Sequence, residues 1–239
     1  INNPWTQGMY FRLAQVVSFS NSFIENAADL ASTNTEAANF VAEARFLRAY
    51  AYLQLMDMYA NVPLVTELTS ELPQQSNRQE IFSFIETELN ELSSSLADSR
   101  SNEYGRVDKV AAWALLSRLY LNAPVYIGSD MSSQVIANAE KVISSSYSLN
   151  TTDGNGNGSA YDELFLADNN TNGAQNEFIF VVQFDGLNSQ SWGGTTFMVH
   201  APIGGSMDPS IFGVNGGWSG LRTTKALVDK FEYSVTATN

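Results

Sequence analysis

The 239-residue sequence contains no cysteine and a single histidine, His200. Without cysteine it can form neither disulfide bonds nor thiolate metal sites, and a cysteine nucleophile is excluded. One histidine also excludes His-rich metal clusters and most mechanisms that use two histidines. Charged residues are scarce as well, at 15% against about 25% in ordinary soluble domains. We therefore expect a surface that is polar but largely uncharged.

Positive charge is especially scarce, with 12 Lys and Arg against 25 Asp and Glu and a formal net charge of −13. This potential repels phosphate backbones and anionic headgroups, so we expect no nucleic-acid partner. No apolar run approaches the roughly 18 residues of a membrane span. Because the sequence begins at Ile1 rather than Met, we expect any signal peptide or lipid anchor to lie outside it.

The first half of the sequence has a helical hydrophobic period. The pattern predicts five helices joined by short polar turns, at about residues 5–30, 36–59, 79–97, 108–122 and 132–145. Short turns imply antiparallel hairpins packed side by side. The predicted fold class is mostly α, a tetratricopeptide-like bundle of helical hairpins with degenerate repeats, joined to a loop-rich region with short strands.

The second half has a different texture. Residues 150–176 are rich in Asn and Gly, the apolar runs 178–184 and 195–199 predict short strands, and a last helix is predicted near 224–231. We expect residues 1–149 to form a scaffold and residues 150–239 to form a loop-rich ligand-binding region packed on it. Long irregular segments beside a rigid scaffold often carry binding sites.

Two tryptophans lie beside glycines: Trp192 is followed by Gly193 and Gly194, and Trp218 stands between Gly216–Gly217 and Gly220. Glycine there indicates tight turns with little side-chain bulk, so each indole can line a cleft and stack on a sugar ring. The alternative, equally weighted, is that each ring plugs a small satellite core. Trp5 is a third candidate, although it may serve only to staple the first helix. Trp113 is expected in the core.

Other polar motifs give weaker signals. The segment Asp153–Gly158 alternates oxygen ligands as calcium loops do, but position 164 is Leu where a bidentate Glu is needed, so an ordinary turn is favoured. The acids Glu86, Glu88 and Glu91 are expected on a solvated helix face, as are Glu36 and Glu43.

No pair of acids shows a spacing diagnostic of a glycosidase, although Asp162, Glu163 and Asp185 lie near the loops. His200 can act as a base, but a lone histidine is more often structural. With no phosphate-binding loop and no Gly-x-Ser-x-Gly motif, nothing indicates an enzyme.

Several segments together resemble the SusD/RagB family of Bacteroidetes outer-membrane nutrient-binding lipoproteins. The resemblance is carried by residues Glu43–Val65, Tyr104–Leu121, Ala139–Ile143 with Tyr147–Leu149, and Asn176–Phe180. The segment Trp192–Phe231 is most similar to the starch-binding member. Family members are considerably longer, which implies that a loop-rich C-terminal part is missing here.

The resemblance implies a non-catalytic protein, lipid-anchored at the cell surface, that captures glycan and delivers it to a SusC-like TonB-dependent transporter. Starch or maltooligosaccharide is the favoured ligand, with Trp192, Trp218 and Trp5 as contacts and further contacts around Gln7 and Arg12. No cofactor is implied. The alternatives are a helical-repeat adaptor that binds only protein, and a glycoside hydrolase, which needs two convergent carboxylates.

Overall fold

The computed structural model describes residues 3–185, 187–189 and 194–230. The chain divides into two compact units, residues 1–181 and 182–239. Residues 150–181 belong to the first unit, where Ser148 N donates to Asn176 O (3.3 Å) and Asn150 N donates to Glu177 Oε2 (2.8 Å). The first compact unit therefore extends beyond residue 149, the expected end of the scaffold.

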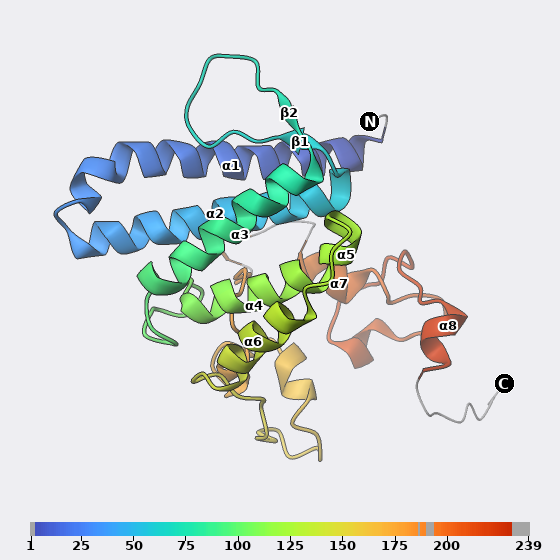
Figure 1. Cartoon of the computed structure of the whole chain (residues 1–239). Helices are drawn as coiled ribbons and strands as arrows, with labels where there is room; N and C mark the ends of the chain where they lie inside the picture. Colours follow the sequence, from blue (N-terminus) through green and yellow to red (C-terminus); the bar gives the residue numbers. More distant parts are fainter. Residues whose placement is uncertain (1–2, 186, 190–193, 231–239) are drawn as a thin grey trace. The chain divides into compact units, whose positions relative to one another are not determined.

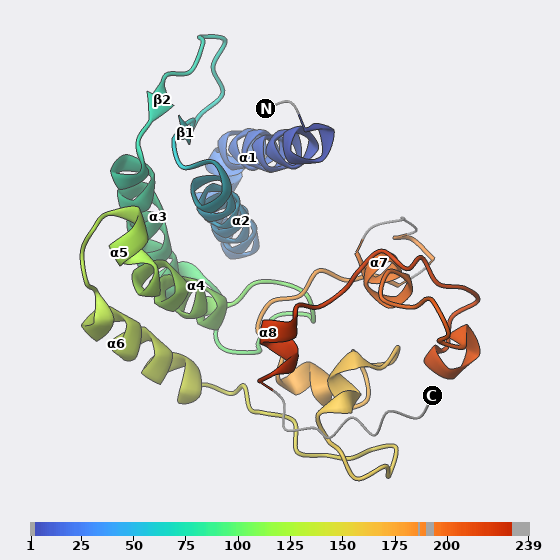
Figure 2. The same cartoon turned by 90° about the vertical axis from the view of Figure 1, so that its right-hand side faces the viewer.

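The first unit is a row of packed helices. It contains α1 (Pro4–Ala31), α2 (Thr35–Tyr59), α3 (Arg78–Ser95), α4 (Lys109–Leu121), α5 (Ala123–Tyr126) and α6 (Ser132–Ile143). Helices α1 and α2, α2 and α3, α3 and α4, and α4 and α6 pack as neighbours (Figure 1, Figure 2). The mostly helical fold and the five long helices predicted from the period are confirmed, and α5 is an additional short turn.

Polar caps set where these helices begin. Asn77 at the start of α3 forms a capping box, in which its side chain accepts from Glu80 N (3.0 Å) and Glu80 Oε2 accepts from Asn77 N (2.9 Å). Asp108 caps α4 by accepting from Val110 N (2.8 Å). Such caps pair backbone N–H groups that the first helical turn leaves without partners.

Helix α2 is buried around most of its circumference because α1 and α3 pack against different sides of it. The expected apolar face is therefore only part of what is buried. Phe40, Leu47 and Met58 of that face are exposed, whereas Phe46 and Tyr52 are among the most deeply buried side chains of the chain.

The expected solvated acidic face of α3 is wrong at Glu88, which is buried. Glu88 accepts from Arg45 Nη2 (2.7 Å) and Arg48 Nη2 (2.9 Å), and Arg48 is itself only 6% exposed. Burial raises the pKa of the Glu88 carboxyl, but the hydrogen bonds and charges of the two arginines outweigh it and bring the pKa below its ordinary value. Likewise, Glu43 pairs with Arg106.

The strands lie elsewhere than expected. Among the described residues, the strands are β1 (Val62–Pro63) and β2 (Gln75–Ser76), an antiparallel pair with Val62 opposite Ser76. The predicted strand at 178–184 is wrong, because Phe180 instead packs its ring on Phe46, with centroids 5.4 Å apart. Ile179 and Phe180 of this run pack against the core of the first unit, whereas Val182 and Phe184 are exposed.

Five short elements follow α6 in the described residues, two in the first unit and three in the second. The first unit ends with the 3-10 turns η1 (Asp162–Phe165) and η2 (Ala174–Asn176), and the second contains α7 (Thr195–His200), η3 (Pro209–Phe212) and α8 (Lys225–Val228). The predicted strand at 195–199 is wrong. Met198 N donates to Gly194 O (3.1 Å) and Ala201 N to Phe197 O (2.9 Å), which closes helical turns despite the β-branched residues.

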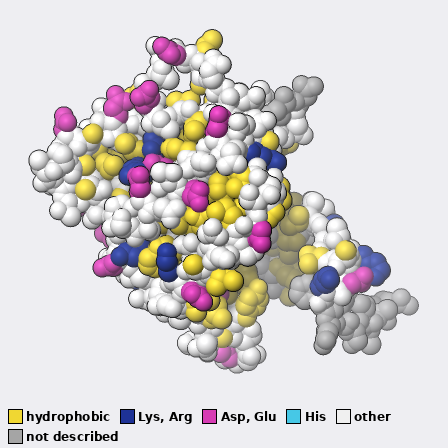
Figure 3. Space-filling model, viewed as in Figure 1, with side chains coloured by type: hydrophobic (Ala, Val, Ile, Leu, Met, Phe, Trp, Pro, Cys, Tyr) yellow, Lys and Arg dark blue, Asp and Glu magenta, His cyan; other side chains and the backbone are white. Residues whose placement is uncertain are grey.

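Acidic side chains are scattered over the face of the molecule seen in Figure 3, among neutral and hydrophobic ones, in agreement with the low charge density. No helix in the described part of the chain combines the length and the apolar character needed to cross a membrane.

Candidate functional site

Three aromatic rings of the second unit lie together. Phe197 and His200 come from α7 at a spacing of three residues, which places them on one face of that short helix. The Trp218 ring stacks on His200, with centroids 5.1 Å apart and planes at 24°, and lies 6.3 Å from Phe197. We call these three residues the aromatic cluster. Phe197 is 46% and Trp218 is 39% exposed, so part of this aromatic surface faces solvent.

Backbone pairing holds Trp218 against α7. Trp218 N donates to His200 O (3.0 Å), Ser219 N donates to Ile203 O (2.9 Å), and Gly220 N donates to Ala201 O (2.9 Å). Segment 218–220 is thereby tied to the chain that leaves α7. The indole is therefore positioned by main-chain bonds as well as by ring contacts.

The glycines beside Trp218 serve this close approach. A Cβ at Gly217 would lie 2.3 Å from Ile203 O, and a Cβ at Gly204 would lie 1.8 Å from Ser219 Oγ. Both distances are too short for any side chain without movement of the neighbours. The expectation that glycine allows tight chain paths around Trp218 agrees with this geometry, although close approach rather than positive φ requires Gly217.

The two interpretations of Trp218 each describe part of its setting. The indole packs on His200 and Phe197, as a ring in a small core does, yet more than a third of the residue is open. Trp192, the other candidate, lies outside the described residues.

His200 is held by oxygen acceptors. Its Nδ1 lies 2.9 Å from Thr196 O and its Nε2 lies 3.4 Å from Asn215 Oδ1. A general base is usually oriented by a carboxylate or paired with a nucleophile. In the described part of the chain, the hydrogen bonds of this ring go to a carbonyl and an amide. The geometry therefore favours His200 as a support for the indole, a role that the sequence pattern did not indicate because 18 residues separate the two rings.

Trp5 belongs to the first unit and lies in the first turn of α1, where it is 86% exposed. Asn3 caps this turn by accepting from Trp5 N (2.9 Å). Further along α1, Phe11, Arg12 and Gln15 line a shallow groove of about 490 Å³, in which Arg12 Nη1 donates to Gln15 Oε1 (3.1 Å). The exposed indole is free of the packing expected of a staple, and polar groups lie on the same helix.

The Asp153–Gly158 segment forms a turn whose carboxylate is occupied by backbone donors. Asp153 Oδ1 accepts from Gly156 N (2.7 Å) and Asn157 N (3.1 Å), and Oδ2 accepts from Gly158 N (2.8 Å). Glu163, one residue out of register for a calcium loop, is buried and accepts from Asn155 N (2.8 Å). Within the described ranges no group of three or more His, Cys, Asp or Glu side chains could hold a metal ion.

The loop carboxylates considered for acid–base chemistry also cap turns. Asp185 Oδ1 accepts from the backbone N–H groups of Ser189 (3.0 Å), Asn188 (2.7 Å) and Leu187 (2.9 Å), which lowers the pKa of Asp185. The Asn157 amide, which donates to Asp162, lowers the pKa of Asp162 as well. A general acid at neutral pH needs a raised pKa, so neither group suits that role.

The chain matches one protein-family model and is similar to a curated protein. Residues 2–121, half of the chain, match the SusD-like family model described as "Starch-binding associating with outer membrane". The starch-binding protein SusD of Bacteroides thetaiotaomicron is 34% identical over 227 residues, which is 95% of this chain. The chain spans 39% of the length of that relative.

Solved structures share the helical arrangement. A SusD-like protein of Bacteroides fragilis superimposes with a TM-score of 0.60 at 26% identity, covering 76% of this chain and 34% of the other. A laminarin-binding SusD-like protein gives a TM-score of 0.56 at 27% identity, covering 69% of this chain and 35% of the other. The family model and these structures agree with the resemblance found in the sequence: the chain belongs to the SusD-like family.

Proposed function

We propose that this chain binds glycan without catalysing a reaction, and that starch-type α-glucan is the favoured ligand. The observation that carries the proposal is the partly exposed indole of Trp218. It stacks on His200, and the backbone of residues 218–220 is hydrogen-bonded to residues 200–203. The relatives support it, because SusD is a starch-binding protein and a similar solved structure is a laminarin-binding one.

The physical basis of the proposal is the flat aromatic face. The C–H face of a pyranose stacks on an indole, and a ring fixed in advance loses little conformational entropy when it binds. Polar groups near the cluster can bond sugar hydroxyls: Asn215 lies beside His200, and the exposed Arg222 donates to Pro202 O (3.4 Å), two residues after His200. We propose Trp218, Trp192 and Trp5 as ligand contacts, with no cofactor.

We further propose that the protein works at the cell surface. It would be held in the bacterial outer membrane by a lipid anchor outside this sequence and would deliver glycan to a SusC-like TonB-dependent transporter. The family description, which associates starch binding with the outer membrane, supports this location. The transporter would be a protein partner of the helical scaffold.

A helical-repeat adaptor that binds only protein is the second candidate function. It is favoured by apolar side chains that α1 leaves exposed, namely Met9, Phe11, Phe19, Phe23 and Leu30. Such a surface is typical of a contact with another protein. The adaptor predicts capture of a transporter with no binding of sugar at millimolar concentration.

Affinity electrophoresis with a panel of polysaccharides tests the proposed function. We expect gels containing amylopectin to retard the protein, with weaker retardation by laminarin and xyloglucan and none by polygalacturonate. Equal mobility in all gels would contradict glycan binding and favour the adaptor. Retardation by laminarin alone would contradict the preference for starch. Release of reducing sugar from starch at high protein concentration would contradict the non-catalytic assignment.

A further inference from the structure

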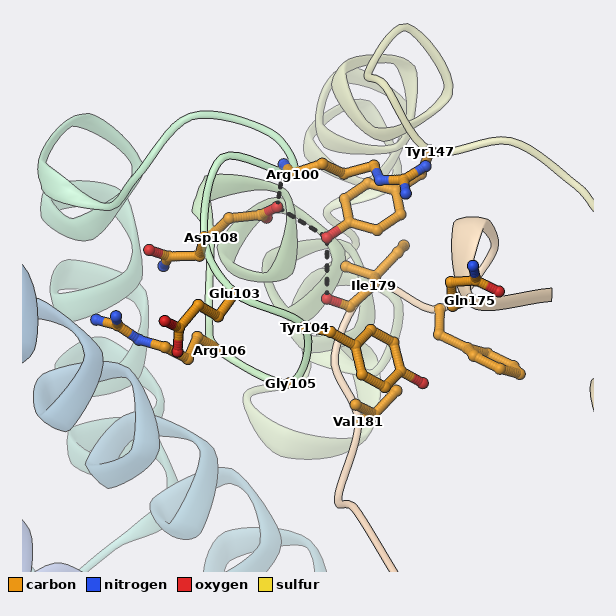
Figure 4. A pocket seen from close by; sticks show the side chains of 12 residues that line it. Arg100, Glu103, Tyr104, Gly105, Arg106, Asp108, Tyr147, Gln175, Ile179 and Val181 are labelled. Carbon is orange, nitrogen blue, oxygen red and sulfur yellow. Dashed lines mark hydrogen bonds between the residues drawn. The ribbon is translucent and has the colours of Figure 1, made fainter. Parts of the chain in front are cut away.

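A separate cavity lies within the first unit, between the loop that precedes α4, the segment after α6 and residues 175–181. Its volume is about 130 Å³, and Figure 4 shows the side chains around it. We call it the Tyr104 cavity. Its aromatic lining comes from Tyr104, Tyr147 and Phe178, and its polar lining includes Arg100, Glu103 and Gln175.

One buried carboxylate fixes two walls of the Tyr104 cavity. Asp108 Oδ2 accepts from Tyr147 Oη (2.8 Å) and from Arg100 N (2.8 Å), while Oδ1 caps α4. Burial and the hydrogen bond to Asp108 both raise the pKa of Tyr147, so its ring remains a neutral phenol. The dashed lines in Figure 4 trace this chain of bonds from Arg100 through Asp108 and Tyr147 to Ile179.

Arg100 is held in an unusual backbone conformation at the edge of the cavity. Its φ of 57° lies in the left-handed region, which non-glycine residues rarely adopt. Its guanidinium lies over the Tyr147 ring at 5.8 Å, and Nη2 donates to Asn176 Oδ1. Within the described residues no acceptor pairs with Nε or Nη1, so both can donate to a ligand. A strained residue that presents fixed donors at a cavity is typical of a binding site.

The volume of the Tyr104 cavity and the charges of its lining limit which class of ligand it can bind. A cavity of about 150 Å³ holds one benzene ring, whereas drug-sized ligands occupy about 300 Å³ or more. At about 130 Å³ the Tyr104 cavity is no larger than this, so it can take at most one sugar ring, with the rest of the glycan lying outside it. Glu103 and Asp108 oppose Arg100, and Arg106 is paired with Glu43, so the lining has no excess positive charge to attract an anionic ligand. Aromatic faces combined with amide, carboxylate and guanidinium groups are suited to a pyranose and its hydroxyls.

We propose that the Tyr104 cavity is a second carbohydrate site, which takes a single neutral pyranose unit of the glycan. This inference rests on the proposed function, since it extends glycan binding from the aromatic cluster of the second unit to the first unit. Two sites on one chain would increase avidity for a polymer without new contacts at either site.

Titration calorimetry with maltotriose tests the proposal, with Trp218→Ala, Tyr104→Ala and the double variant compared with wild type. We expect wild type to bind at two sites, Trp218→Ala to keep one, and the double variant to lose about tenfold or more of the remaining affinity. Tyr161→Ala is the control, because Tyr161 is an exposed tyrosine of the same unit that does not line the cavity.

Arg100→Ala provides a second test should Tyr104→Ala not fold. The positive φ at position 100 is as costly for alanine as for arginine, so this substitution adds no backbone strain. In the Trp218→Ala background it is expected to weaken maltotriose binding, with trigalacturonate bound by neither protein. One site in wild type, abolished by Trp218→Ala and unchanged by Tyr104→Ala or Arg100→Ala, would overturn the second site and leave the proposed function intact. No binding of maltotriose or of starch by wild type would overturn both.

Discussion

Replacing Trp218 with alanine is expected to weaken α-glucan binding by an amount that the structure bounds. The residue is 39% exposed, which corresponds to about 100 Å² of a tryptophan surface of about 250 Å². At about 25 cal/mol per Å², complete coverage by sugar is worth about 2.5 kcal/mol and half coverage about 1.2 kcal/mol. These values correspond to a loss of affinity of about 8-fold to about 70-fold.

Isothermal titration calorimetry with maltoheptaose measures this loss. Phe212→Ala is the matched control, because Phe212 is a 47% exposed aromatic residue of the same unit that has no ring contact with Trp218 among the described residues. Trp218→Phe keeps an aromatic face of smaller area and is expected to fall between wild type and Trp218→Ala. Circular dichroism of each variant reports whether the helices remain folded.

The reasoning would be refuted by a Trp218→Ala protein that keeps its helical dichroism and binds maltoheptaose as wild type does. It would also be refuted if Phe212→Ala lost as much affinity, since the effect would then come from general loosening of the second unit. In either case the exposed indole would belong to the packing of that unit and not to a binding surface.

Other features of the structure give further predictions. Glu88→Ala removes the carboxylate that pairs with buried Arg48, so we expect the free energy of urea unfolding to fall by about 3–5 kcal/mol. Glu91 is an exposed partner of Arg45, and Glu91→Ala should lower it by less than about 1 kcal/mol. Because the folded-state pKa of Glu88 lies below its ordinary value of 4.5, its stabilisation is present above that value and is lost as pH falls through the lowered pKa. Melting temperatures measured from pH 6 to pH 3 should show this loss, and Glu88→Gln should flatten it. Gly217→Ala would place a Cβ 2.3 Å from the backbone oxygen of Ile203, so we expect it to lower the free energy of unfolding by about 1–3 kcal/mol. Because the same clash would displace Trp218, we also expect weaker maltoheptaose binding. EDTA should leave the maltoheptaose affinity unchanged, and a loss of affinity restored by calcium would contradict the cofactor-free proposal.

The helices of the first unit could be predicted from the sequence because a helical period is a local property. The stripe of Ile81, Ile85, Leu89 and Leu92 is repeated every three or four residues, and all four side chains are fully buried in α3. The family could be recognised for a related reason, since its motifs lie in contiguous segments such as Tyr104–Leu121.

Apolar runs without a clear period were predicted less well. The segment 195–199 contains β-branched residues and was expected to be a strand, yet it forms most of α7. The segment 178–184 has strand composition, but its Phe180 ring packs against Phe46 and Tyr50 of α2. A short apolar run without a clear period does not determine which secondary structure the backbone adopts.

The amino-acid sequence by itself determined the helical scaffold, the acidic and weakly charged surface and the family, because each depends on composition or on neighbours along the chain. Only the tertiary structure decided that Glu88 is buried between two arginines, that His200 supports Trp218, and that Arg100, Tyr104 and Gln175 line one cavity. These contacts join residues far apart in the sequence, and local pattern carries no information about which distant side chains the folded backbone brings together.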